Sequence, residues 1–252
     1  MEDRNTTGSK RRIFLKQIAT MAGAGPLGIS LGAPAGLAAV AAFGPSSALA
    51  DDQPAGEQVL GYEALSQDEA ALVEAMVNVM CPADDLTPNG VDSGLAIYID
   101  RQLAGGFGQG AGYYMRGPWK HGKPELGYQL PLRPVEFFKA GASAVAAQCS
   151  KQYGKGFDQL SAADADAFLD AIATGKVTDP RVPLGSWFND LAYPLFIQAC
   201  FADPIYGGNR NKVFWKVVGY PGLPATHARD MVEFRGKPYP GAKDPKSIAD
   251  FS

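Results

Sequence analysis

The chain has 252 residues, of which 46% are hydrophobic and 19% are charged, and its formal net charge at pH 7 is −3. This composition is typical of a globular protein that is long enough to bury one good core. The slightly acidic balance offers no basic surface of the kind that binds nucleic acid, so we expect no nucleic-acid partner.

The first 50 residues differ in composition from the rest. Arg11 and Arg12 stand before a weakly apolar run, rich in Ala and Gly, that extends from Ile18 to Phe43. Ala48-Leu49-Ala50 has the small-x-small pattern of a signal cleavage site. Together these features predict a twin-arginine signal peptide over residues 1–50, cleaved after Ala50.

A retained membrane anchor is the alternative for this segment, because the apolar run is long enough to span a bilayer. The sequence also departs from the twin-arginine pattern at Lys10, which occupies the place where that pattern usually has Ser or Thr. The many glycines and two prolines of the run do not suit a stable helix. The cleavage pattern also argues against a retained anchor. Removal of the five basic and two acidic residues of the signal leaves a single domain, residues 51–252, with 18 basic and 24 acidic residues and a net charge of −6.

Five segments of this domain have the apolar spacing of helices. Ser66 and Glu69 form a capping box for the first, and Pro134 suits the first position of the third. Pro194 is expected to kink the fifth. The predicted helices cover residues 66–80, about 93–104, 134–153, 161–175 and about 186–201. No stretch alternates well enough for a sheet, so we predict an all-α fold, an irregular bundle of about five or six helices.

Two long segments lack helical spacing. Residues 105–133 are rich in glycine and aromatic residues, including Tyr113, Tyr114 and Trp119. Long irregular loops in compact domains are usually functional or disordered, and the aromatic content argues against disorder. We therefore expect an ordered arm that lies over a larger partner. Residues 223–252 contain scattered prolines and are predicted to form an extended C-terminal strap.

Few residues of the domain suit catalysis. It holds only two histidines, His121 and His227, and no nucleophile elbow or metal-ligand motif. The three cysteines are Cys81, Cys149 and Cys200. An oxidising compartment permits one disulfide with a leftover thiol, whereas their apolar neighbours in predicted helices equally suit three buried free thiols. Asp100-Arg101 invites interpretation as an acid or an ion pair, but adjacent helical residues point in different directions, so we expect them to bond separate neighbours. The carboxylate pairs Asp84/Asp85 and Asp164/Asp166 have structural explanations as a turn and a helix start.

The segment from Phe201 to Gly222 is the most distinctive of the chain, and we call it the signature. Asp203 before Pro204 starts a turn, and Asn209 is placed to cap a short helix that contains Trp215 and ends at Gly219. Its basic residues would form a cationic rim around an aromatic patch and could meet an acidic partner: Arg210, Lys212 and Lys216. The alternative is that Trp215 and Phe214 are ordinary core and that the charges are merely solvated.

The signature resembles that of the gluconate 2-dehydrogenase subunit 3 family. The likeness rests on residues 203–210 (Asp-Pro-Ile-Tyr-Gly-Gly-Asn-Arg) and 215–222 (Trp-Lys-Val-Val-Gly-Tyr-Pro-Gly). Three further segments occur in the expected order, at 81–85, 98–103 and 126–129, so the resemblance covers most of the chain after residue 60.

The resemblance implies an accessory subunit without a cofactor of its own. Its partners would be a GMC-type large subunit with FAD and a multihaem cytochrome c, with an iron–sulfur cluster as a further group that a partner could hold. The complex would act in the periplasm, at the outer face of the cytoplasmic membrane, on gluconate or a related sugar. The implied partner interface comprises Asp203, Tyr206, Asn209, Arg210, Trp215 and Lys216 of the signature with Tyr113, Tyr114 and Trp119 of the arm.

The sequence also allows two functions from other classes. One is a free-standing exported enzyme, for example a hydrolase that uses Asp203 or Asp100 with His121. The other is a binding protein for a small sugar, with a pocket lined by Trp119, Trp187 or Trp215.

Overall fold

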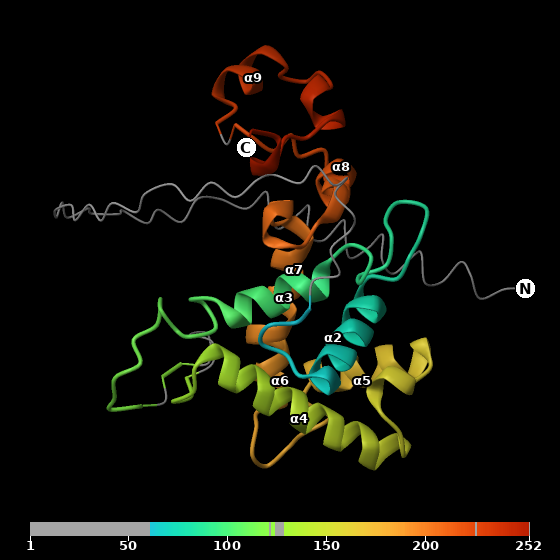
Figure 1. The fold of residues 1–252 in the computed structure, drawn as a ribbon, viewed down its shortest axis with the longest axis vertical. Helices are drawn as coiled ribbons and strands as arrows, with labels where there is room; N and C mark the ends of the chain where they lie inside the picture. Colours follow the sequence, from blue (N-terminus) through green and yellow to red (C-terminus); the bar gives the residue numbers. More distant parts are fainter. Residues whose placement is uncertain (1–60, 121, 124–128, 225, 252) are drawn as a thin grey trace, which may run out of the picture. The chain divides into compact units, whose positions relative to one another are not determined.

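The structure, a computed structural model, describes residues 61–120, 122–123, 129–224 and 226–251 (Figure 1). The predicted twin-arginine signal, with Arg11, Arg12 and the cleavage site after Ala50, lies outside these residues. The described residues contain helices, turns and an isolated bridge between Gly222 and Lys246, with no β-strand. The all-α prediction is confirmed.

The first two described helices match their predicted positions. Helix α2 (Gln67–Met80) begins with the capping box, because the Ser66 side chain accepts from the Glu69 backbone and the Glu69 side chain accepts from the Ser66 backbone. Each of these bonds satisfies a backbone N–H that the start of a helix leaves without a partner. Helix α3 (Leu95–Ala104) follows after a turn.

Helix α4 (Pro134–Tyr153) has the predicted bounds, with Pro134 in its first turn and Gly154 as its C-cap in the left-handed region. Gly141 inside this helix, an unfavourable residue there, has a packing reason. A Cβ added at Gly141 would lie 2.0 Å from the Trp187 ring. The absence of a side chain therefore lets the Trp187 indole lie against the helix, where its Nε1 donates to the Phe138 carbonyl oxygen at 3.0 Å.

Helix α5 (Ala162–Ala173) begins at Ser161, whose hydroxyl accepts the Asp164 backbone N–H. A short 3₁₀ turn, η2 (Phe157–Gln159), precedes it and buries Phe157 beside Phe168. The predicted helix over residues 161–175 is thus confirmed in type and shortened by a residue or two at each end.

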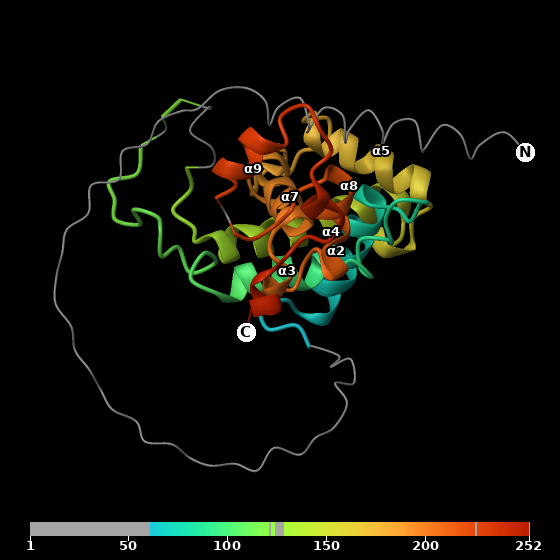
Figure 2. The ribbon, with the colours of Figure 1, turned by 90° about the horizontal axis from the view of Figure 1, so that it is seen from above.

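The predicted fifth helix differs in detail. It consists of α6 (Leu184–Ser186), a π-helical turn η3 (Trp187–Ala192) and α7 (Tyr193–Phe201). The Tyr193 N–H donates to the Phe188 carbonyl, five residues earlier. Pro194 has no N–H and its ring crowds the preceding turn, and the wider π-helical turn gives it room where we had expected a kink. Helix α3 lies against α7 (Figures 1 and 2). Helix α4 packs on η3.

Short elements complete the chain. The signature forms η4 (Pro204–Tyr206), η5 (Arg210–Lys212) and α8 (Val213–Val218). The segment after Gly222 is less extended than we predicted. It folds into α9 (Ala228–Glu233), η6 (Pro240–Lys243) and η7 (Ile248–Phe251), and returns to the signature, because η6 contacts α8 and η7 contacts η4. Among the described residues, no helix has both the length and the apolar character needed to cross a membrane.

Candidate functional site

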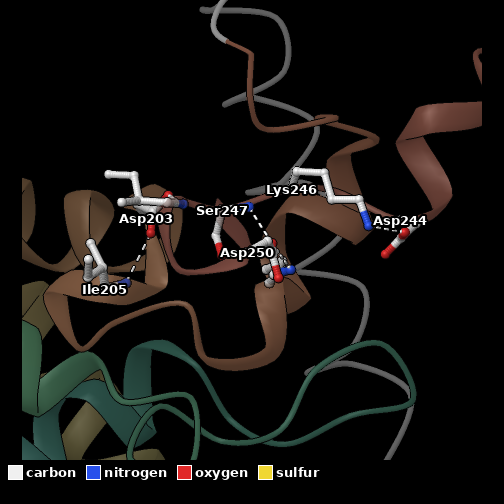
Figure 3. Close-up of polar contacts among 8 residues, drawn as sticks. Asp203, Ile205, Asp244, Lys246, Ser247 and Asp250 are labelled. Carbon is white, nitrogen blue, oxygen red and sulfur yellow. Dashed lines mark hydrogen bonds and ion pairs between the residues drawn. The ribbon is translucent and has the colours of Figure 1, made fainter. Parts of the chain in front are cut away.

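Asp203 joins the signature to the C-terminal segment. Its Oδ1 accepts the Ile205 backbone N–H at 3.0 Å, which fixes the turn of η4, and its Oδ2 accepts the Ile248 backbone N–H at 2.9 Å (Figure 3). Both carboxylate oxygens are therefore used to hold backbone in place. The same figure shows Asp250 accepting from Ser247 and Lys246 paired with Asp244 on the C-terminal segment.

Glycines let the signature approach the helices closely. Gly207 has φ +96°, and a Cβ added at Gly208 would lie 2.5 Å from the Ala199 carbonyl oxygen at the end of α7. A Cβ at Gly94, just before α3, would lie 2.2 Å from the Gly207 oxygen. These contacts leave no space for a side chain, so the turn rests directly on backbone of α3 and α7.

Asn209 is fully buried, and its side chain bonds to backbone groups of the same chain. Its Nδ2 donates to the Ala202 carbonyl at 3.1 Å, and its Oδ1 accepts the Phe214 N–H at 3.0 Å. The predicted cap thus exists, but it reaches across η5 to α8 and is not made from the residue that immediately precedes the helix. Asn209 supports the signature from within and has no exposed surface for a partner.

Trp215 also lies inside, with 5% of its surface exposed. Its Nε1 donates to the Phe201 carbonyl at 2.8 Å, and its ring meets the edge of Tyr220 at a centroid distance of 5.1 Å. Phe214 is buried beside Phe201. Trp215 and Phe214 are therefore core residues, as the alternative interpretation proposed, and any part they have in docking is indirect.

The expected cationic rim is only partly at the surface. Lys212 is 18% exposed and its Nζ lies 2.5 Å from Asp250 Oδ2. This hydrogen bond, together with the Ser247 N–H, holds the pKa of Asp250 well below its ordinary range. Arg210 lies half-buried, with its backbone N–H donating to the Ser93 carbonyl. Of the three cations, Lys216 is the exposed one.

Arg210 is near enough to Tyr62 to influence it. Burial raises the pKa of Tyr62 most, the hydrogen bond to Glu74 raises it further, and the positive charge of Arg210 opposes these effects. The Tyr62 hydroxyl donates to Glu74 Oε1 at 2.6 Å.

An apolar surface that we did not predict lies where η4 meets η7. It consists of exposed side chains from the two elements, and we call it the η4–η7 surface: Ile205, Tyr206, Ile248 and Phe251. Of these, only Tyr206 was expected at an interface. The one signal in the sequence was the three-residue spacing of Ile248 and Phe251, which is too short to identify a helical face.

The arm, residues 105–133, presents its aromatic side chains to solvent. Tyr114 is 79% exposed, Tyr113 46% and Trp119 44%. The base of the arm is held by the Val135 N–H, which donates to the Gly108 carbonyl at 3.1 Å, and by Arg133, whose Nη1 donates to Gln109 Oε1 at 2.6 Å. Exposed Tyr and Trp on an anchored segment are typical of protein–protein interfaces.

A family model described as gluconate 2-dehydrogenase subunit 3 matches residues 67–222, more than half of the chain. The chain belongs to this family. Its members are subunits of a multi-subunit dehydrogenase, so the chain is a component of such a complex. No curated protein and no solved structure matches it.

The family match contains both the arm and the signature, and it ends at Gly222, the residue that bridges to Lys246. The exposed interface candidates within the match are Tyr206, Lys216, Tyr113, Tyr114 and Trp119. The C-terminal half of the η4–η7 surface lies beyond it.

Asp100 has a structural role in this family member. It is fully buried, and its carboxylate accepts the backbone N–H groups of Glu63, Ala64 and Leu65 at 2.8, 2.9 and 2.9 Å. Arg101 Nη2 lies 3.6 Å from Oε1 of the same Glu63. The expectation of separate neighbours is therefore wrong for Glu63, because Asp100 accepts its backbone N–H and Arg101 pairs with its side chain. The carboxylates of Asp100 and Asp203, which the hydrolase alternative would use, both accept backbone N–H groups. His121 lies outside the described residues.

The sugar-pocket alternative gains no support from the buried tryptophans. Trp187 is fully buried and Trp215 nearly so, and each indole N–H already has a carbonyl partner. Neither ring face is available to stack on a sugar. Trp119 is separated from them on the arm.

The thiols and the remaining carboxylates have structural surroundings. Cys81, Cys149 and Cys200 are buried and form no disulfide with one another, which selects the alternative of three thiols. Asp84 accepts the Leu86 and Thr87 N–H groups in a turn, as expected for a structural acid. Within the described ranges, no cluster of three or more His, Cys, Asp or Glu residues is arranged to hold a metal ion.

The second histidine, His227, links the end of the signature to α9. Its Nε2 faces the Gly222 carbonyl at 3.1 Å and its Nδ1 faces Asp230 Oδ2 at 3.1 Å. Both neighbours are acceptors, so the doubly protonated ring fits best. The pKa of His227 is accordingly raised, first by the bond to Gly222 and then by Asp230.

Proposed function

We propose that this chain is the non-catalytic small subunit of an exported dehydrogenase complex that oxidises a sugar or sugar acid. In the proposed complex, a GMC-type large subunit carries FAD and the reaction, and a multihaem cytochrome c passes electrons towards membrane quinone. An iron–sulfur cluster is a further group that a partner subunit could carry. This chain would hold no cofactor itself.

The small subunit would stabilise the large subunit and bring it through export. The twin-arginine route carries folded proteins, so a partner without its own signal can travel with one that has Arg11 and Arg12. The assembled complex would act in the periplasm, at the outer face of the cytoplasmic membrane.

The observation that carries the proposal is the pattern of exposure in the family-matched region. The acids that a catalytic mechanism would need, Asp100 and Asp203, are engaged with backbone N–H groups, whereas the aromatic side chains of the arm face solvent. A free-standing enzyme needs the opposite arrangement, with reactive groups accessible and apolar side chains buried. A docking subunit needs the arrangement that is present.

The test is affinity purification of the chain from the exported fraction of its native host, followed by mass spectrometry and an optical spectrum. We expect flavin and haem absorbance to co-purify with two larger subunits. In a strain that produces the Arg11→Lys, Arg12→Lys variant, both this chain and the flavin subunit should disappear from the exported fraction. A colourless single chain that turns over a sugar by itself would overturn the proposal.

A further inference from the structure

The arm carries a local positive charge that differs from the charge of the remaining domain. The arm, residues 105–133, has four basic residues and one acidic residue, Glu125, although the domain as a whole is acidic. At the outer part of the arm, three of these cations are exposed: Arg116, Lys120 and Lys123. None of the three forms an ion pair with another described residue.

These exposed cations alternate with the exposed aromatic residues. Tyr113 and Tyr114 precede Arg116, and Trp119 lies directly before Lys120. Tyr, Trp and Arg are the residues that most often contribute strongly to binding at protein interfaces. A cation without an internal partner retains its full charge for a partner of opposite sign.

The base of the arm is ordered before any partner binds. Gly108 lies so close to α3 that a Cβ would stand 1.8 Å from the Leu103 carbonyl oxygen. The edge of Tyr113 meets Phe107 at a centroid distance of 6.2 Å. These contacts, with the bonds to Val135 and Arg133 described above, limit the conformations of the arm and so reduce the entropy that binding must remove.

We propose that Arg116, Lys120 and Lys123 dock the arm on an acidic surface of the flavin-carrying subunit, with Tyr113, Tyr114 and Trp119 covering apolar area between the charges. The inference rests on the proposed function, to which it adds the chemistry of the partner surface. Complementary charge mainly accelerates association and fixes orientation. The signature supplies less of this charge, because Lys212 is bound to Asp250 and Arg210 is half-buried, which leaves Lys216 as its exposed cation.

A membrane surface is the other class of partner that Tyr, Trp and basic residues suit. Family membership favours a protein, because the chain is a subunit of a multi-subunit dehydrogenase. The test below includes vesicles so that the two are separated.

The experiment uses competition between two copies of the full chain in the native host. Wild-type chain and the variant Arg116→Glu, Lys120→Glu are co-produced with different affinity tags, and the flavin absorbance recovered per mole of each is compared. The matched control is Lys155→Glu, Lys237→Glu, which changes the net charge equally at exposed positions outside the arm. Because the arm cations form no ion pair with another described residue, the arm variant should have the circular dichroism spectrum and the melting temperature of wild type. If the Glu variant does not accumulate, the milder Arg116→Gln, Lys120→Gln variant replaces it.

We expect the arm variant to recover about tenfold less flavin subunit than wild type, and the control to recover a similar amount. Washing the captured wild-type complex at high ionic strength should reduce the difference, since exposed charges are screened over about 8 Å at physiological salt. Equal recovery by the arm variant, or an equal loss in the control, would overturn the inference and leave the proposed function intact. Loss of binding to phosphatidylglycerol vesicles with unchanged flavin recovery would assign the arm to a lipid surface instead. If wild-type chain itself recovers no flavin subunit, the proposed function fails.

Discussion

Asn209 offers the sharpest test of how the signature is held together. In Asn209→Ala, the buried Phe214 N–H loses its acceptor at a cost of about 1–3 kcal/mol, and the part-buried Ala202 carbonyl loses its donor at a cost of about 1 kcal/mol. The residue has φ +46°, a conformation that Asn tolerates better than Ala, which adds about 1 kcal/mol. We expect the variant to lose about 3–5 kcal/mol of unfolding free energy in total.

Asn211 supplies the matched control. It has φ +57° but is exposed, so Asn211→Ala removes the backbone preference without removing a described side-chain bond, and should cost about 1 kcal/mol. Asn209→Gly relieves the backbone and loses both bonds, so it should fall between the two. Urea unfolding followed by tryptophan fluorescence measures all three, since Trp187 and Trp215 are buried. If Asn209→Ala is no less stable than Asn211→Ala, the buried Asn209 amide does not stabilise the signature.

Two other changes test groups that a catalytic interpretation would have used. Asp100→Asn replaces one acceptor oxygen by an NH₂ group that faces the Glu63 N–H. We therefore expect a loss of about 2–3 kcal/mol in unfolding free energy and faster hydrogen exchange at residues 63–65. An unchanged stability with altered turnover would contradict the structural role of Asp100. The raised pKa of His227 means that its protonated form stabilises the fold, fully below its unfolded pKa of about 6.5 and less as pH rises through the folded value. The melting temperature of wild type relative to His227→Gln should therefore fall as pH rises above about 6.5, and a constant difference would refute the assignment.

Helix positions were predictable where local chemistry marks both ends. The bounds of α4 follow from Pro134 and Gly154, and the start of α2 follows from the Ser66–Glu69 capping box, because these signals act within a few residues of one another. The exposure of Tyr113, Tyr114 and Trp119 was also predictable, since a segment without periodicity gives these side chains no helical face to bury.

Burial within the signature was not predictable from the sequence. Whether Trp215 faces in or out depends on the Phe201 carbonyl 14 positions away, and Lys212 is drawn inward by Asp250, 38 positions away. In a six-residue helix, apolar spacing cannot distinguish a buried face from an exposed one. The prediction therefore placed Asn209 and Trp215 in the interface, whereas the structure uses both to support it.

The bond between Asp203 and Ile248 has a consequence for synthesis of the protein. Translation must add 45 residues after Asp203 before its second oxygen can receive the Ile248 N–H. The signature is therefore finished late, long after α2 to α5 can have formed on the ribosome. A chain cut at the boundary of the family match, after Gly222, would leave the Asp203 carboxylate and the Lys212 ammonium without these partners. The natural unit for expression or for transfer to another protein is consequently longer than the family match.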